Sequence, residues 1–151
     1  MWSAVFVQDM RRVILSLTAI VVTLSLSAQT YKVGDIYDVN GKKGVVFEVS
    51  EDGQHGKIIS SELVSDKVTW NQAMEWGSQL KDGWYIPSLE EMNAILKVGD
   101  EILAKMPKAR SFYWTTTEYN KDCAWFGAIR GASRGALYKG NKFYAKPISK
   151  F

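Results

Sequence analysis

Residues 83–88 read Gly-Trp-Tyr-Ile-Pro-Ser, and residues 113–118 read Tyr-Trp-Thr-Thr-Thr-Glu. The first string ends on a serine that forms a capping box with Glu91, a pattern that begins helices. Thr69 and Gln72 make the same pattern upstream. The order of capped helix, aromatic string, capped helix and aromatic string predicts one fold with an aromatic core. The expected core aromatics are Trp70, Trp84, Tyr113, Trp114 and Trp125.

Strand-like runs flank the two helices. Residues 31–63 alternate β-branched and aromatic runs with turn residues such as Asn40-Gly41, a pair typical of tight hairpins. Short runs return after Pro107, and the turn pair at 140–141 predicts that residues 136–139 and 142–148 form a hairpin. Glycines at positions 83 and 99 are expected to end the two helices. Strands, two main helices and strands again imply an α+β domain with an N-terminal β-hairpin region and an antiparallel sheet.

The first 28 residues have the composition of a secretory signal peptide. Arginines at positions 11 and 12 precede an apolar run over residues 13–26, and small residues lie around Ala28, where we expect cleavage. The run is shorter than the roughly 20 residues that span a membrane. An uncleaved anchor, and a true start at Met10 instead of Met1, are the alternatives. Membrane contact is expected only during export, and the mature chain is expected in the periplasm, at the cell surface or outside the cell.

The remaining residues, 29–151, have the length of a single domain. We divide it into an N-terminal β segment, 29–65, and a core with the helices, 66–151. Cys123 is the chain's one cysteine, so no internal disulfide forms; burial as a small apolar side chain is favoured over a thiol that links to another protein. His55, the one histidine, lies in a glycine-containing turn and offers little support for a catalytic relay. The sequence therefore predicts no enzyme activity, no metal and no cofactor.

Charge divides the mature chain in two. Residues 29–103 carry 7 lysines and 13 acidic residues, whereas residues 104–151 carry 10 lysines or arginines and 2 acidic residues. The basic part either pairs with the acidic part or faces an anionic partner. Arginine binds sulfate and carboxylate groups, and an exposed aromatic ring can lie against a sugar. The candidate ligand-binding residues are Arg130, Arg134, Tyr138, Lys139, Lys142 and Tyr144.

The basic face has two other interpretations. The first is a solvated surface without a ligand. The second is a nucleic-acid site, which also suits basic and aromatic residues but is a poor candidate for an exported protein. As a strand, residues 142–148 would place Lys142 and Tyr144 on the same face.

The ordered motifs resemble the Lcl C-terminal domain family, named for a Legionella collagen-like adhesin. The likeness covers about residues 66–151 and consists of the residues 70–73, 84–88 with 90–91, 113–116 and 124–125. That family commonly has a Trp-Arg-Leu-Pro-Thr string, a Tyr-Trp-Ser-Ser-Thr string, an Ala-Trp pair and a basic C-terminal strand. Fibrobacter paralogous domains are similar, and residues 31–61 resemble the lead-in of secreted Bacteroidetes relatives. The resemblance implies a C-type lectin-like fold.

The chain also departs from these relatives. Tyr85 stands where the family usually has arginine, and Lys-Pro-Ile-Ser at 146–149 replaces an arginine-rich ending. The calcium-binding strings of true C-type lectins are absent, and one cysteine cannot supply the chemistry of formylglycine-generating enzymes, which share the superfold. We therefore interpret the chain as an exported, non-catalytic binding or adhesion module of the bacterial envelope, with an anionic polysaccharide as the preferred ligand. The alternative is a structural subunit of a surface or envelope assembly that contacts an envelope protein. A weaker alternative is an unrecognised enzyme of formylglycine-generating-like fold.

Overall fold

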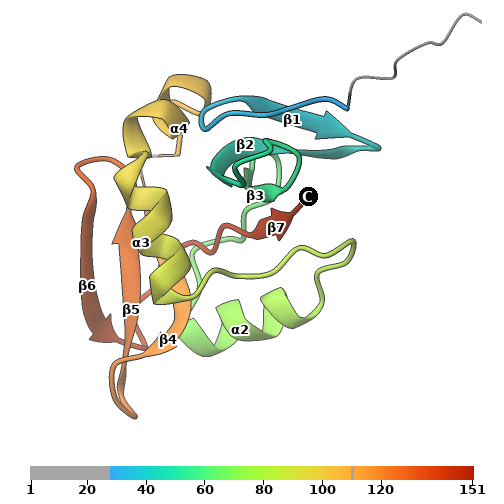
Figure 1. Cartoon of the computed structure of the whole chain (residues 1–151). Coiled ribbons are helices and arrows are strands. Elements are labelled where there is room, and N and C mark those ends of the chain that lie inside the picture. The colour runs from blue at the N-terminus through green and yellow to red at the C-terminus, as the bar shows by residue number, and fades with distance from the viewer. Residues whose placement is uncertain (1–27, 110) are drawn as a thin grey trace, which may run out of the picture.

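The computed structural model describes residues 28–109 and 111–151, so all of the predicted signal peptide except Ala28 lies outside the described residues. The described chain forms two antiparallel sheets and three helices (Figure 1). The predicted α+β class is therefore confirmed, with the strands divided between two sheets. Within residues 28–109 and 111–151, no helix is both long and apolar enough to cross a membrane.

The first sheet joins the two ends of the described chain. Its strands, in spatial order, are β1 (Ile36–Val39), β2 (Lys42–Val49), β3 (Gly56–Ser60) and β7 (Ile148–Lys150). Asn40 and Gly41 have φ angles of 52° and 80°, the left-handed values that a tight turn between β1 and β2 requires. The predicted N-terminal hairpin is confirmed, and pairing of β7 with β3 brings the C-terminus into the same sheet.

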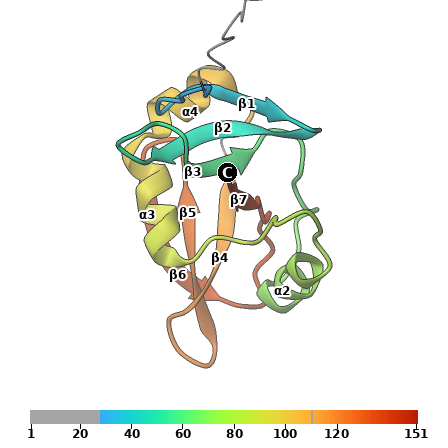
Figure 2. The same cartoon turned by 45° about the vertical axis from the view of Figure 1, so that its right-hand side comes forward.

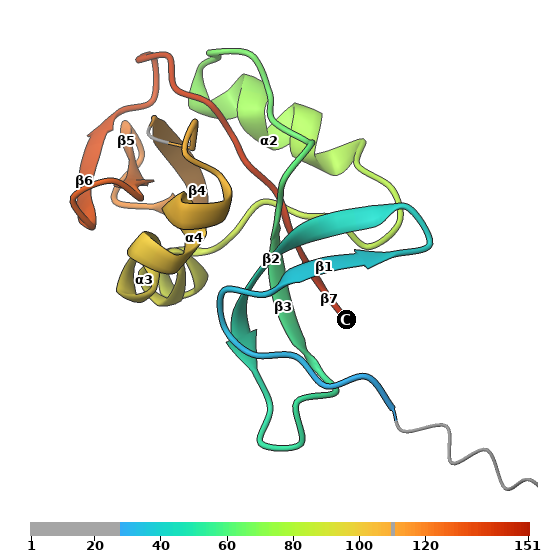
Figure 3. The ribbon, with the colours of Figure 1, turned by 90° about the horizontal axis from the view of Figure 1, so that it is seen from above.

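The second sheet contains β4 (Phe112–Glu118), β5 (Cys123–Ala128) and β6 (Ser133–Tyr138) in that order. The predicted hairpin of residues 136–139 with 142–148 is wrong, because β6 pairs with β5 and the chain then leaves this sheet. Figure 3 shows the segment after β6 crossing from the second sheet to the first. We call residues 143–147 the crossing segment. Since it is not a regular strand, Lys142 and Tyr144 do not share a strand face.

Three helices pack against the sheets: α2 (Trp70–Ser78), α3 (Leu89–Lys97) and α4 (Gly99–Lys105). Both predicted capping boxes are present, at Thr69 and at Ser88. The prediction for Gly83 is wrong, because α2 ends at Ser78 and Gly83 lies in the loop beyond it. Helix α3 ends at Lys97, close to the predicted end at Gly99, and Gly99 then begins α4, where a Cβ atom would lie 2.9 Å from the carbonyl oxygen of Ile129. Figure 2 shows α3 on one side of the second sheet and α2 on the other, with α4 at the top beside β1.

Buried side chains form three clusters. The largest lies between the sheets, α3 and α4; the second surrounds Trp114 beneath α2; the third lies on Val46 and Ile58 of the first sheet. Of the five predicted core aromatics, Tyr113 and Trp114 are buried. Trp70 and Trp84 are half-buried and pack against the second and third clusters. Trp125 needs correction: it is half-buried and packs edge-on against the ring of exposed Tyr119.

Candidate functional site

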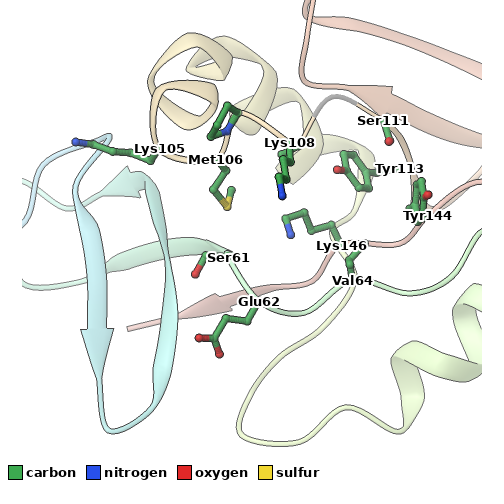
Figure 4. A pocket seen from close by; sticks show the side chains of 12 residues that line it. Ser61, Glu62, Val64, Lys105, Met106, Lys108, Ser111, Tyr113, Tyr144 and Lys146 are labelled. Carbon is green, nitrogen blue, oxygen red and sulfur yellow. The ribbon is translucent and has the colours of Figure 1, made fainter.

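A cavity of about 520 Å³ opens where the α4–β4 connection and the residues after β3 meet the crossing segment (Figure 4). Its volume is within the roughly 300–1,000 Å³ that is usual for small-molecule sites. We call it the Lys146 pocket. The lining residues that matter for its chemistry are Glu62, Lys105, Lys108, Tyr113, Tyr144 and Lys146.

Backbone hydrogen bonds hold Lys146 in place on both sides. The amide of Ala145 donates to Ser65 Oγ at 2.7 Å, and the Ser65 amide donates to the Ala145 carbonyl at 2.9 Å. On the other side, the Ser60 amide donates to the Pro147 carbonyl at 2.9 Å. Ala145 packs with Trp114 in the second cluster, whereas Lys146 lines the pocket. The hydrogen bonds of Ala145 and Pro147 therefore fix the direction of the Lys146 side chain.

Lys146 is a buried cation with little to stabilise its charge. The whole residue is only 6% exposed. Its Nζ donates one long hydrogen bond, 3.3 Å, to the Leu63 carbonyl. Burial lowers the pKa of Lys146 from 10.5 to about 8. Within the described part of the chain, no carboxylate oxygen lies within 4.0 Å of Nζ. Glu62, the acidic residue of the described lining, already pairs with Lys43 at 3.3 Å.

Apart from Glu62, the charged and phenolic side chains of the pocket are also donors. Figure 4 shows Lys108 extending toward Lys146, with Lys105 farther out at the rim. Tyr113 is buried, and burial raises the pKa of its hydroxyl, so this group stays protonated at neutral pH. The Tyr113 and Tyr144 ring centroids lie 6.4 Å apart. Ammonium and phenol donors beside apolar surface suit an anionic ligand with an apolar face.

The six predicted ligand-binding residues do not form one face. Arg130 lies in the turn between β5 and β6, and Arg134, the second residue of β6, donates from Nη1 to Asn93 Oδ1 of α3. Tyr138, 62% exposed, lies at the opposite end of β6. Lys142 is exposed just beyond the following turn.

Lys139 and Tyr144 have other surroundings. Lys139 Nζ lies 2.9 Å from a Glu118 carboxylate oxygen, donates to the Lys121 carbonyl at 2.9 Å, and sits 4.5 Å from the centroid of the Trp70 ring. These contacts give Lys139 a role in the fold itself. Tyr144 is the one predicted residue that lines the Lys146 pocket. A ligand-binding role for all six residues stays a prediction.

Sequence reasoning missed Lys146 as a site residue. The available signal was its neighbours, because Ala145 and Ile148 on either side of this lysine are residue types that are commonly buried. His55 is exposed, and Cys123 is half-buried. Across residues 28–109 and 111–151, no group of three or more His, Cys, Asp or Glu side chains is arranged to hold a metal ion.

Comparisons with known proteins give structural matches only. No family model matches the chain, and no curated protein matches it. A chain of the complex between a von Willebrand factor mutant A1 domain and botrocetin matches with a TM-score of 0.40 and 10% identity, over 78% of this chain and 97% of that one. EMS16, an antagonist of a collagen receptor integrin, matches with a TM-score of 0.40 and 10% identity, over 78% and 95% of the two chains. The snake venom toxin convulxin has a TM-score of 0.40 and 11% identity, over 80% and 97%.

These neighbours are C-type lectin-like proteins, the class that the family resemblance implies. At this level of similarity they carry no argument about ligand, partner or family. The resemblance to the Lcl C-terminal domain family stays a prediction.

Proposed function

We propose that this chain is an exported, non-catalytic binding module that holds an anionic saccharide in the Lys146 pocket. One observation supports this most strongly: Lys146 is buried and its ammonium group faces the cavity, but no carboxylate among the described residues pairs with it, since Glu62 of the lining pairs with Lys43. Buried charges in proteins are usually paired, because removal of a charge from water is costly. A carboxylate or sulfate in the cavity would supply the missing partner.

The rest of the pocket fits a sugar acid. Lys108 adds a second positive charge near Lys146, and the Tyr113 hydroxyl adds a neutral donor. The half-buried ring of Tyr144 offers apolar surface to a sugar ring. A terminal uronic acid of a polysaccharide combines these features, since it has one carboxylate on a compact ring.

Isothermal titration of the purified protein with D-glucuronate tests this proposal. D-glucose is the matched probe, because it has the same ring without the carboxylate. We expect glucuronate to bind at least about tenfold more tightly than glucose, since a charge-assisted contact is worth about 1.5–3 kcal/mol. Lys146→Met should abolish the preference, whereas Lys121→Met, a change at an exposed lysine, should leave it intact. Equal binding of the two sugars, or an unchanged preference in Lys146→Met, would refute the pocket as the site.

The predicted basic face is tested separately, by the binding of heparin. If Arg130, Arg134 and Lys142 hold the ligand, their joint replacement by alanine abolishes binding of heparin, and the affinity of the parent falls steeply with salt. Lys139 is left unchanged in this variant because it pairs with Glu118. If the triple variant loses glucuronate binding while Lys146→Met binds glucuronate as the parent does, the ligand site is the basic face and not the Lys146 pocket.

A structural role in an envelope assembly is the second candidate, and one surface favours it. Phe112 and Leu137 are 49% and 43% exposed on the same face of the second sheet, beside half-buried Phe126 and Phe143. Exposed apolar surface of this kind occurs at protein contacts. Sedimentation velocity over a range of concentrations tests it: a structural subunit that associates through this face should form oligomers that Phe112→Ser with Leu137→Ser disperses.

A further inference from the structure

A second hollow, about 460 Å³ in volume, lies beside Trp84. It shares no lining residue with the Lys146 pocket. We call it the Trp84 hollow. The residues that give it its chemistry are Tyr37, Asn40, Lys42, Asp82, Trp84 and Lys150. They come from three separate parts of the chain: the β1–β2 hairpin, the loop after α2 and the C-terminal strand.

The indole of Trp84 is held firmly at this hollow. The half-buried Trp84 packs against the cluster of Tyr31, Val46 and Ile58. Lys42 Nζ lies 5.7 Å from the centroid of the Trp84 ring and donates to Ser149 Oγ at 2.9 Å.

The loop that carries Trp84 is tied to the same contacts. The buried Ser149 hydroxyl donates to the Gly83 carbonyl at 2.9 Å. This chain of hydrogen bonds joins β2, β7 and the loop at 82–84, so the ring and the cation beside it need little ordering when a ligand binds.

Backbone conformation is unusual on two sides of the same hollow. Among residues 28–109 and 111–151, three residues other than glycine have positive φ angles: Asn40 at 52°, Asp82 at 59° and Ala132 at 47°. Two of these three line the Trp84 hollow. Asn and Asp tolerate this conformation better than other residues, and at Asn40 the β1–β2 turn itself requires it. The two turns thus bring an amide and a carboxylate to the rim of one aromatic surface.

We propose that the Trp84 hollow binds an uncharged saccharide ring. Sugar hydroxyls both donate and accept hydrogen bonds, and the hollow offers the acceptor Asp82, the donors Lys42 and Lys150, and Asn40, which does both. The indole face suits the flat C–H face of a pyranose. A strongly anionic ligand would meet Asp82, and a cationic one would meet the two lysines, so a neutral polyhydroxylated ring fits the set best. This site is additional to the proposed function, which concerns an anion in a different cavity.

Nuclear magnetic resonance with ¹⁵N-labelled protein tests the proposal. The chain has six tryptophans, and Trp84→Phe assigns the indole signal of Trp84 by its disappearance. The probes are the methyl glycosides of D-glucose, D-galactose, D-mannose and N-acetyl-D-glucosamine. We expect at least one of them to shift the Trp84 indole signal in a saturable manner.

The decisive variant combines Asn40→Gly with Asp82→Gly. Glycine adopts positive φ freely, so both turns are kept while the amide and the carboxylate are removed. We expect the affinity for the responding glycoside to fall by about fivefold or more, since each lost hydrogen bond is worth about 0.5–1.5 kcal/mol. Ala132→Gly is the matched control, because it makes the same kind of change at the third positive-φ residue, in the distant β5–β6 turn, and should leave the affinity unchanged.

Three results would overturn the inference. One is the absence of a saturable shift of the Trp84 signal with all four glycosides. Another is a double-glycine variant that is folded, by its dispersed spectrum, and binds as the parent does. The last is loss of the shift in Lys146→Met, because the two hollows would then act as one site. Failure of glucuronate to bind in the Lys146 pocket leaves this test unaffected.

Discussion

Replacement of Lys146 by methionine should make the protein more stable. Methionine has a similar length and keeps apolar contacts in the buried position, but it removes the ammonium group. The folded-state pKa of Lys146, about 8, lies below its ordinary value of 10.5. At about 1.4 kcal/mol per pH unit, this difference means that the buried charge costs up to about 3 kcal/mol of folding free energy at neutral pH.

The pH dependence gives the sharper test. Below pH 8 the lysine is charged in both the folded and the unfolded chain, so the whole cost is present. Between pH 8 and 10.5 the folded chain loses its proton first, and the cost declines. The stability gained by Lys146→Met should therefore be about 2 kcal/mol smaller at pH 9.5 than at pH 7. The measurement is urea unfolding, followed by circular dichroism, at both pH values.

Lys121→Met is the control, because Lys121 is exposed and its replacement should change the free energy of unfolding by no more than about 0.5 kcal/mol. A Lys146→Met protein that is less stable than the parent at pH 7 would show that the ammonium group stabilises the fold. A gain that is the same at both pH values would show that burial does not depress the pKa of Lys146. Either result would refute the reasoning.

Three further predictions concern other parts of the molecule. The affinity for glucuronate should be constant below pH 8 and fall above it, because Lys146 loses its charge there; titration calorimetry at pH 7 and pH 9.5 measures this. Trp114→Ala should lower the free energy of unfolding by about 3–5 kcal/mol, since the side chain is fully buried and its Nε1 donates to the Val68 carbonyl at 3.0 Å; thermal unfolding reveals whether any folded protein remains. Burial favours a higher pKa for Glu91, but hydrogen bonds from Tyr85 and Ser88 and the Lys57 ammonium outweigh it and hold the pKa below 4.5. Glu91→Gln should therefore destabilise the protein at pH 7, and the difference should vanish as the pH falls through the lowered pKa of Glu91, which acid unfolding curves of both proteins measure.

Local chemistry explains which parts of the fold could be predicted. A capping box needs only residues three apart, and the boxes at Thr69 and Ser88 formed where the sequence placed them. The hairpin turn at 40–41 is equally local. Gly140 and Asn141 offer similar turn residues, but the chain after them finds its hydrogen-bond partners far away, at Val68, Ser65 and Tyr85. Because partners distant in sequence decide the path of residues 143–148, no local pattern could predict it.

The same limit applies to the candidate site. Composition shows that the C-terminal part of the chain is basic, but it does not show which cations are already paired. The structure pairs Lys139 with Glu118 and brings Arg134 to Asn93, so two of the predicted contact residues are partly occupied. Lys146 became a candidate only when the fold placed it in a cavity where no carboxylate of the described residues pairs with it.

Lys139 and Lys146 together show why the second lysine favours a ligand. Both side chains are largely removed from solvent, but the Lys139 ammonium has a carboxylate, a backbone carbonyl and the face of Trp70 around it. A buried cation that stabilises the fold usually has partners of these kinds. The Lys146 ammonium has one carbonyl at 3.3 Å and an open cavity on which Lys108 also converges. An apolar residue would fill the same position at lower cost, so the charge itself calls for an explanation. An anion that enters the cavity would give Lys146 the pairing that the described chain gives Lys139.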